Sequence, residues 1–353
     1  MFKVGVNGFG TIGRRVAAAI LKQDDMNLVG VADVSPSWKI RCASKIPFFY
    51  GLRNYNLNEN EQFEIIKKTF TDEKIEPKGT ILDLINEANL IVDCTPKKIG
   101  KANKDKLYSR KNDLHALFQG GEKASIAEVT FNAYINYKDA IGVRFIRIPS
   151  CNTTGMLGFL NIIQSVSDVK KVIVNLIRRG ADPPEPKSGP INDYVPTAIP
   201  SHHVEDVISA DSRLNGKLIT YGVKVPITLM HMHNVIAFGN FPSREKILNA
   251  FRENPRMVVI GGKEVPTAAQ VMEANERKNL YQIAILEKTI HIHGDILLFS
   301  VYVHQEADVV PENIDAIRAS LGYEDSKDSI ERTNKSLDLI NTKKKLESYF
   351  PVY

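Results

Sequence analysis

The residues best suited to covalent chemistry lie together in the segment Ser150-Cys151-Asn152-Thr153-Thr154-Gly155. The segment follows a hydrophobic strand predicted at 145–148 and begins a helical pattern that runs to about residue 167. At a helix start, unpaired N–H groups and the positive end of the helix dipole stabilise a thiolate and lower the pKa of a thiol. The position therefore predicts that Cys151 is a nucleophile. The alternative is a buried structural cysteine, because free cysteines are among the most buried residues.

Histidines in the second half of the chain could handle the proton that a thiol attack on an aldehyde requires. His231 and His233 are two residues apart in a predicted strand, so they share one of its faces, and either could be the base. Packing is the alternative for both. His202 and His203 could hold an oxyanion or a phosphate. We predict no metal site, because no Asp, Glu or Cys partner has ligand spacing.

Arg178 and Arg179 end a predicted strand and resemble an anion clamp, since guanidinium groups bind phosphate bidentately. Adjacent strand residues point to opposite faces. We therefore expect one arginine to bind the anion and the other to form a structural ion pair.

A glycine-rich segment near the amino terminus, Asn7-Gly8-Phe9-Gly10-Thr11-Ile12-Gly13, lies between a predicted strand and a predicted helix. In this context Gly8 allows a tight turn, Gly10 admits a pyrophosphate, and Gly13 permits close packing of helix on strand. The second predicted strand ends at Asp33, twenty residues after Gly13. A carboxylate there suits the ribose hydroxyls of NAD and repels the 2′-phosphate of NADP. The pattern predicts an NAD site, with a merely glycine-rich turn as the alternative.

The order of predicted elements indicates two domains. Strands and helices alternate as far as residue 150, which predicts an α/β fold with a Rossmann-type doubly wound parallel sheet. The stretch 63–69 is predicted as an extra strand of this half. Long strands with few helices follow, which predicts an α+β catalytic domain with a mainly antiparallel or mixed sheet. Its final strands are expected at 283–287, 289–293 and 296–303, and the chain is expected to end in helices at 311–321 and 325–347.

The composition fits a globular protein of 353 residues with a formal charge of +5. No basic–aromatic stripe favours nucleic acid, and no apolar run reaches bilayer length or resembles a signal peptide. Three widely spaced cysteines, Cys42, Cys94 and Cys151, indicate a reducing compartment and no disulfide framework. We expect a cytoplasmic protein with no membrane or nucleic-acid partner.

Together the motifs closely resemble those of the archaeal-type (class II) phosphorylating glyceraldehyde-3-phosphate dehydrogenases, in order and rough spacing from residue 1 to about 320. Besides the glycine-rich and cysteine segments, the resemblance rests on five further motifs. These are Phe118-Gln119-Gly120-Gly121-Glu122-Lys123, Arg178-Arg179-Gly180-Ala181-Asp182-Pro183, Gly189-Pro190-Ile191-Asn192, Pro200-Ser201-His202-His203 and Leu229-Met230-His231-Met232-His233.

The resemblance implies a homotetramer that oxidises glyceraldehyde 3-phosphate with NAD(P) and inorganic phosphate to 1,3-bisphosphoglycerate. It implies that Cys151 is the nucleophile and favours His231 over His233 as the base. The positions implied to contact the substrate are Ser150, Cys151, Asn152, His202 and His203. Those implied to contact the cofactor are Thr11, Ile12, Gly121, Arg179 and Gln305. It further implies a dinucleotide-binding domain at 1–150, a catalytic domain at 151–310, and C-terminal helices at 311–353 that pack back on the first domain.

The chain departs from the family pattern at three places. Ala32-Asp33 stands where relatives often have Lys or Thr, which favours NAD over NADP. Gly158 stands where relatives often have an arginine, which predicts a weaker phosphate or intersubunit contact. The stretches 54–60 and 213–216 resemble surface insertions. Two alternatives are a related aspartate-semialdehyde or acyl-phosphate dehydrogenase and a non-catalytic NAD-binding module.

Overall fold

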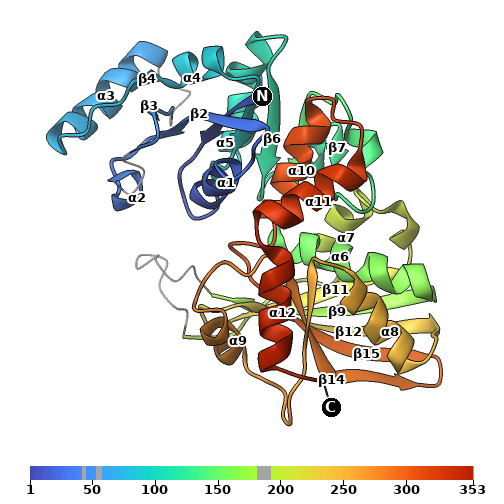
Figure 1. The fold of residues 1–353 in the computed structure, drawn as a ribbon. Coiled ribbons are helices and arrows are strands. Elements are labelled where there is room, and N and C mark those ends of the chain that lie inside the picture. The colour runs from blue at the N-terminus through green and yellow to red at the C-terminus, as the bar shows by residue number, and fades with distance from the viewer. Residues whose placement is uncertain (42–44, 53–57, 181–191, 353) are drawn as a thin grey trace. The chain divides into compact units, whose positions relative to one another are not determined.

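The computed structural model describes residues 1–41, 45–52, 58–180 and 192–352. They form two compact units (Figure 1). The first unit consists of Met1–Ser150 and Val310–Leu337, and the second consists of Cys151–Val309 and Asp338–Tyr353. Each unit has its own sheet.

The sheet of the first unit is parallel throughout its described strands, as predicted. Its strand order is β4-β3-β2-β1-β5-β6-β8-β7. The order reverses at β1, which has β2 on one side and β5 on the other, and in such sheets ligands bind beside this reversal at the carboxyl ends of the strands. The strands are β1 (Phe2–Asn7), β2 (Met26–Asp33), β3 (Phe48–Tyr50), β4 (Gly79–Thr80), β5 (Leu90–Asp93), β6 (His115–Gln119), β7 (Val129–Thr130) and β8 (Phe145–Ile148).

Helices pack on this sheet and bury an apolar core. Leu84, Ile91, Tyr108 and Phe118 belong to one core cluster, in which no residue is more than slightly exposed. The helices of the unit are α1 (Gly13–Ile20), α2 (Trp38–Arg41), α3 (Glu59–Asp72), α4 (Ile81–Glu87), α5 (Ile99–Lys106), α10 (Val310–Ser320) and α11 (Ser326–Ser336). Short 3-10 turns span Tyr108–Arg110, Ala124–Ile126 and Tyr137–Ala140.

The prediction of an extra strand at 63–69 is wrong, because these residues lie inside α3. Asn58 caps the helix in a reciprocal capping box with Glu61. Ile66 and Phe70 are four residues apart and both buried, which is the spacing of one helix face and not of a strand. Of the predicted insertion at 54–60, residues 54–57 lie outside the described part of the chain.

The second unit contains a mixed sheet of order β10-β11-β9-β12-β15-β14-β13, also as predicted. The pairs β11–β9 and β13–β14 are parallel, and the other pairs are antiparallel. The strands are β9 (Asp168–Arg179), β10 (Val195–Pro196), β11 (Leu218–Val225), β12 (His231–Asn240), β13 (Met257–Ile260), β14 (Ile283–His293) and β15 (Ile296–Val303). The helices are α6 (Cys151–Val166), α7 (His203–Ile208), α8 (Arg244–Glu253), α9 (Ala268–Ala274) and α12 (Leu339–Tyr349), with a 3-10 turn at Ser212–Leu214.

Two boundaries in the second half differ from the prediction. The strands expected at 283–287 and 289–293 are one strand, β14, whose pairing with β15 shifts register between Leu286 and His291. The helix expected at 325–347 is two helices, because Asp338 adopts a left-handed conformation with φ of 59°. Of the residues expected to pack on the first domain, α10 and α11 lie in the first unit and α12 lies in the second.

Candidate active site

The glycine-rich loop connects β1 to α1 and has the geometry that a bound pyrophosphate needs. Gly8 has a φ of +90°, and a Cβ there would lie 2.8 Å from the backbone carbon of Cys94. A Cβ on Gly13 would lie 1.9 Å from the carbonyl oxygen of Gly8. A Cβ on Gly10 would meet nothing within 4 Å, so the backbone there is open to a ligand. These residues therefore fit a dinucleotide phosphate group.

Asp33 holds this loop against the end of β2. Its Oδ2 accepts the backbone N–H of Phe9 at 2.8 Å, and its Oδ1 accepts the N–H groups of Val34 at 2.7 Å and Ser35 at 3.2 Å. Each carboxylate oxygen has two lone pairs, so Oδ2 retains capacity for a ribose hydroxyl.

A buried polar network, which was not predicted from the sequence, joins the ends of β1 and β5. Asp93, at the end of β5, accepts hydrogen bonds from the hydroxyl of Tyr108 at 2.6 Å and the side-chain amide of Asn103 at 2.7 Å. The Asn7 amide donates to the Tyr108 hydroxyl at 2.8 Å and thereby joins β1 to the network. Burial raises the pKa of Asp93, against the hydrogen bonds from Thr95, Tyr108 and Asn103. In the sequence, the only sign of this network is a carboxylate, Asp93, directly after the apolar run Leu90-Ile91-Val92.

Gly121 follows β6 in another loop at the carboxyl edge of the same sheet. Gly120 has a φ of +102°, and a Cβ on Gly121 would lie 3.2 Å from the Cβ of Lys97, in the loop after β5. The lack of a side chain thus lets the two loops approach closely. Thr11 and Ile12 precede α1 in the glycine-rich loop, with the Thr11 carbonyl accepting the Arg15 guanidinium at 2.7 Å.

Cys151 is the first residue of α6, a 16-residue helix, as the sequence predicted. The pKa of its thiol is nevertheless raised and not lowered. Burial is the largest cause, and the negative charge of Asp308 is the next. The guanidinium of Arg179 and the N–H of Asn152 act in the opposite direction without overcoming the burial. The direction of this pKa is therefore opposite to the one expected from the helix start, although the side chain is partly exposed.

His231 and His233 lie on the buried face of β12, with exposed fractions of 3% and 0%. Nδ1 of His231 accepts the backbone N–H of Arg179 at 3.0 Å, so the neutral ring carries its proton on Nε2. Nε2 of His233 lies 2.9 Å from Oδ1 of Asn152, the residue after Cys151. Nδ1 of His233 has no hydrogen-bond partner in the described part of the chain. Asn152 thus links the start of α6 to the histidine face of β12.

Both imidazoles are neutral at physiological pH. Burial is the largest cause of the low pKa of His231, followed by the electrostatic interaction with His233 and the charges of Arg179 and Arg178. Burial and then Arg178 lower the pKa of His233 to about 3. Neutral rings can donate or accept a proton without first losing a charge.

One of the two adjacent arginines forms a structural ion pair, as predicted, and anion binding by the other stays a prediction. Arg179 is buried, and its guanidinium pairs with Oε1 of Glu306 at 2.8 Å and also contacts Oε1 of Gln305. Arg178 has a buried Nε without a hydrogen-bond partner among the described residues. The charge of Arg178 acts on Cys151, His231 and His233, as well as on His203, so these five side chains gather in one region of the second unit.

Glu306 connects Arg179 to a further histidine that the sequence analysis did not single out. Its Oε2 lies 2.8 Å from Nε2 of His304, and Nδ1 of His304 accepts the backbone N–H of Leu280 at 2.9 Å. The histidine, carboxylate and guanidinium are all buried. Hydrogen bonds from His304 and Arg179, together with the charge of Arg179, lower the pKa of Glu306 despite its burial. The signal in the sequence was the polar run His304-Gln305-Glu306 directly after β15.

His202 and His203 differ in environment. His203 is 1% exposed, with Nδ1 3.3 Å from Oγ of Ser201, whereas His202 is exposed. Their ring centroids are 4.1 Å apart. Burial, followed by the charges of His202 and Arg178, lowers the pKa of His203 to about 2. A phosphate beside His203 would meet a neutral imidazole, so Arg178 is the cation that could balance its charge.

Other predicted positions are placed as follows. Ser150 is the last residue of the first unit's amino-terminal segment. Gly158 lies inside α6, where a Cβ would come within 2.8 Å of the buried Met257 methyl group, so this side of the helix is packed in the second unit. The motif residues 181–183 and 189–191, like Cys42, lie outside the described residues.

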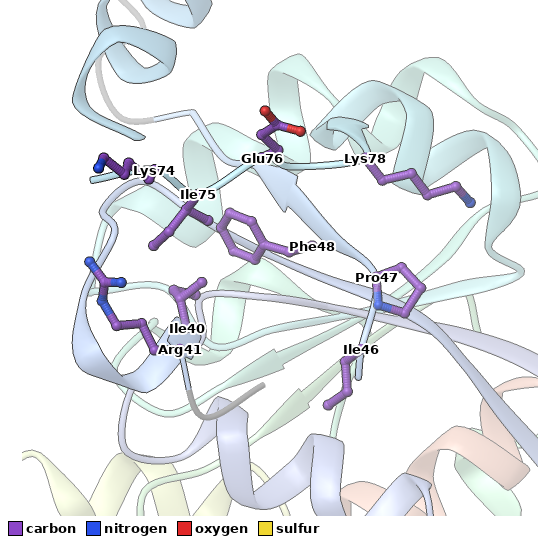
Figure 2. A pocket seen from close by; sticks show the side chains of 9 residues that line it. All are labelled: Ile40, Arg41, Ile46, Pro47, Phe48, Lys74, Ile75, Glu76 and Lys78. Carbon is purple, nitrogen blue, oxygen red and sulfur yellow. The ribbon is translucent and has the colours of Figure 1, made fainter. Parts of the chain in front are cut away.

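A cavity of about 530 Å³ in the first unit contains none of the predicted site residues. Figure 2 shows Ile40, Phe48 and Ile75 facing one another inside it. The cavity lies at the amino-terminal ends of β3 and β4, because Phe48 begins β3 and Lys78 precedes β4. Dinucleotides bind at the carboxyl ends of such strands, so this cavity is not the cofactor site.

No helix in the described part of the chain is both long and apolar enough to cross a membrane. Among the same residues, no group of three or more His, Cys, Asp or Glu side chains is arranged to hold a metal ion.

A parallel sheet with a glycine-rich loop after its first strand, joined to a unit that opens with a cysteine, defines a two-domain NAD(P)-dependent oxidoreductase. Residues 2–101 match the glyceraldehyde 3-phosphate dehydrogenase NAD binding domain, and residues 150–289 match the C-terminal domain of the same enzyme. The chain belongs to the glyceraldehyde-3-phosphate dehydrogenase family.

Archaeal relatives match along nearly the whole chain. The glyceraldehyde-3-phosphate dehydrogenase of Metallosphaera sedula is 41% identical over 348 residues, which cover 96% of this chain and 98% of the relative. That of Methanococcus vannielii is 40% identical over 352 residues, or 96% and 100% of the two chains. That of Pyrobaculum calidifontis is 41% identical over 357 residues, or 98% and 99%. The resemblance to the archaeal-type enzymes is thus confirmed.

Proposed function

We propose that this protein catalyses the reversible oxidation of glyceraldehyde 3-phosphate to 1,3-bisphosphoglycerate with NAD(P) and inorganic phosphate. One observation carries the proposal at the level of the site: the first residue of α6 is a thiol, and the charge of Arg178 acts both on it and on three buried imidazoles. This combination suits a phosphorylated aldehyde better than a neutral one.

Cys151 is the proposed nucleophile. Its sulfur attacks the aldehyde carbon and forms a C–S bond, and the thiol proton leaves to a base. The resulting hydroxyl group loses its proton and the substrate carbon gives up a hydride, for which a bound cofactor would be the acceptor, so that a thioester remains on Cys151. Phosphate then attacks the thioester carbonyl and releases the acyl phosphate and the free thiol. Because the pKa of the thiol is raised, we propose that a base removes its proton as the sulfur attacks.

His231 is the proposed catalytic histidine. Its Nε2–H can hydrogen-bond the aldehyde oxygen as negative charge develops there, because its Nδ1 is engaged by Arg179. His233 is the second candidate for proton removal, since its Nδ1 has an open lone pair while Nε2 donates to Asn152. The variants His231→Gln and His233→Gln separate these roles through kcat, with NAD affinity measured alongside. If His233→Gln loses kcat and His231→Gln does not, the role proposed for His231 is wrong and His233 is the catalytic histidine.

Substrate contacts are proposed at Ser150, Cys151 and Asn152 and at the pair His202 and His203, with Arg178 supplying the positive charge for phosphate. A related dehydrogenase of aspartate semialdehyde would use the same thiol chemistry but would bind a substrate carboxylate in place of a phosphate. The decisive assay compares kcat/KM for glyceraldehyde 3-phosphate with that for aspartate semialdehyde. Turnover of the semialdehyde alone would overturn the proposed substrate.

The dinucleotide-binding domain is proposed to comprise residues 1–150, and the catalytic domain residues 151–310. The proposed cofactor contacts in the first are Gly8, Gly10, Thr11, Ile12, Gly13, Asp33 and Gly121, and in the second Arg179 and Gln305. When bound, the cofactor supplies the hydride acceptor. Asp33 favours NAD over NADP, because its carboxylate would repel a 2′-phosphate. Comparison of kcat/KM for the two cofactors, with Asp33→Ala as the variant, tests this preference. We further propose a homotetramer located in the cytoplasm.

A further inference from the structure

Trp38 is the only tryptophan of the chain and is 50% exposed. It begins α2, five residues after Asp33. The guanidinium carbon of Arg14 lies 5.1 Å from the centroid of its ring, within the range of a cation–π contact. A large aromatic side chain that is half exposed next to a ligand-binding loop is a candidate contact for that ligand.

Arg14 places this aromatic ring beside the glycine-rich loop. It is the second residue of α1, and its backbone N–H donates to the carbonyl of Gly10 at 3.3 Å. Its Nε is buried and has no hydrogen-bond partner among the described residues. Arg14 therefore links the indole of Trp38 to the glycine-rich loop. Asp33 binds the same loop through the backbone N–H of Phe9.

We propose that Trp38, braced by Arg14, stacks on the adenine ring of the dinucleotide and helps to select adenine nucleotides. The inference rests on the proposed cofactor site. There Asp33 takes the ribose of the adenosine half, so the base attached to that ribose lies near the segment that follows β2. Bases stack readily on aromatic side chains, and an indole already fixed by a guanidinium loses little freedom on doing so.

The same arrangement suggests a second ligand contact for Arg14, whose Nε has no hydrogen-bond partner among the described residues. Arg14 lies in the first turn of α1, where the helix end favours anions, so its guanidinium can face the phosphates while its plane covers the indole. The same side chain would then join the base and phosphate parts of one ligand.

Because Trp38 is the only tryptophan, the fluorescence of the whole protein reports on it. We expect AMP and NAD to quench this emission, with excitation at the red edge where adenine does not absorb. Nicotinamide mononucleotide, which lacks adenine, should leave the emission unchanged. By calorimetry, Trp38→Ala should weaken NAD binding about tenfold, whereas Trp38→Phe should keep affinity within about threefold. Tyr349→Ala is a matched control, because Tyr349 is also exposed and lies under a cation, Lys345.

Three outcomes decide the matter. Quenching by AMP together with weaker binding by Trp38→Ala alone supports the stack. Unchanged NAD affinity in Trp38→Ala, with native binding intact, overturns the stack and leaves the cofactor site standing. Absence of any NAD binding by the native protein overturns both the stack and the cofactor assignment.

Discussion

At the scale of single residues, Cys151 combines a predicted position with an unpredicted chemical state. The helix start was visible in the sequence as a strand followed by capping residues. The carboxylate of Asp308, one cause of the raised pKa, lies more than 150 positions further along the chain, so this rise could not be predicted from the local motif. Desolvation and Asp308 raise the pKa of the thiol, whereas the helix start was expected to lower it.

Replacement of Cys151 should separate catalysis from cofactor binding. Cys151→Ser should reduce aldehyde oxidation to background, because a hydroxyl is a much weaker nucleophile, while NAD binding stays within about twofold. In the native protein, iodoacetamide should modify this thiol slowly at neutral pH and progressively faster on the alkaline side, since burial raises its pKa. Mass spectrometry of the modified peptide measures the rate, and unchanged turnover by Cys151→Ser would exclude covalent catalysis there.

The buried histidines should make the protein sensitive to acid. The pKa values of His203 and His233 are about 2 and about 3 in the folded protein, against an ordinary value of 6.5. Between these values and 6.5 the unfolded chain binds more protons than the folded protein. The contribution of these two histidines to the free energy of unfolding is therefore fully present above about pH 6.5 and is lost as the pH is lowered towards 3. His233→Asn should flatten this fall in urea unfolding experiments.

The exposed His293 provides the control for acid sensitivity. His293→Asn should keep the native dependence of unfolding free energy on pH. Equal slopes for both variants would show that the buried ring does not cause the effect.

At the scale of elements, side-chain contacts join the end of β9 to the segment after β15. Glu306 contacts both His304 and Arg179. Glu306→Gln leaves the guanidinium of Arg179 buried without its carboxylate, which should lower the free energy of unfolding by about 3–5 kcal/mol. It should also lower the pKa of Cys151, because the charge of Arg179 that acts on the thiol is no longer balanced. Iodoacetamide should then modify Cys151 faster at neutral pH.

Glu287 provides a matched control for this prediction, because it is a buried carboxylate in the same unit and pairs with Arg244. Glu287→Gln should reduce stability while leaving the modification rate of Cys151 as it is in the native protein. A similar acceleration in both variants would mean that general loosening, and not the charge of Arg179, controls the thiol.

Sequence reasoning worked best where a local pattern decides the element. The loop after β1 and the start of α6 needed only neighbouring residues, and both were placed correctly. The strand predicted at 63–69 failed because Phe63 and Ile65 alternate like a strand, whereas the buried pair Ile66 and Phe70 and the capping residue Asn58 fix a helix. The partners of Arg179 and His304 depend on contacts between distant segments, which local periodicity does not record.

At the scale of the whole chain, the first unit is built from segments almost 300 positions apart. Arg318 of α10 is fully buried, and it donates to both carboxylate oxygens of Asp25, to Gln23 and to Thr333. Arg318→Met should therefore lower the unfolding free energy by about 3–5 kcal/mol, since it leaves buried acceptors without their donor. Chemical denaturation of the full chain measures this. Lys101→Met, which removes one member of an exposed ion pair with Asp105, should cost much less.

The proposed homotetramer makes a prediction about an apolar surface of the second unit. Tyr194, Val195, Ile199, Ile227 and Leu229 are all exposed, and Val195 belongs to β10 at the edge of the sheet. Exposed apolar side chains beside a strand that is outermost among the described strands are typical of an assembly surface. We predict a mass near four times 39.5 kDa by light scattering, and Val195→Lys with Ile199→Lys should shift the protein to smaller species. Replacing the exposed Leu21 in the first unit with lysine should leave the mass unchanged, and a native protein of 39.5 kDa would contradict the assembly itself.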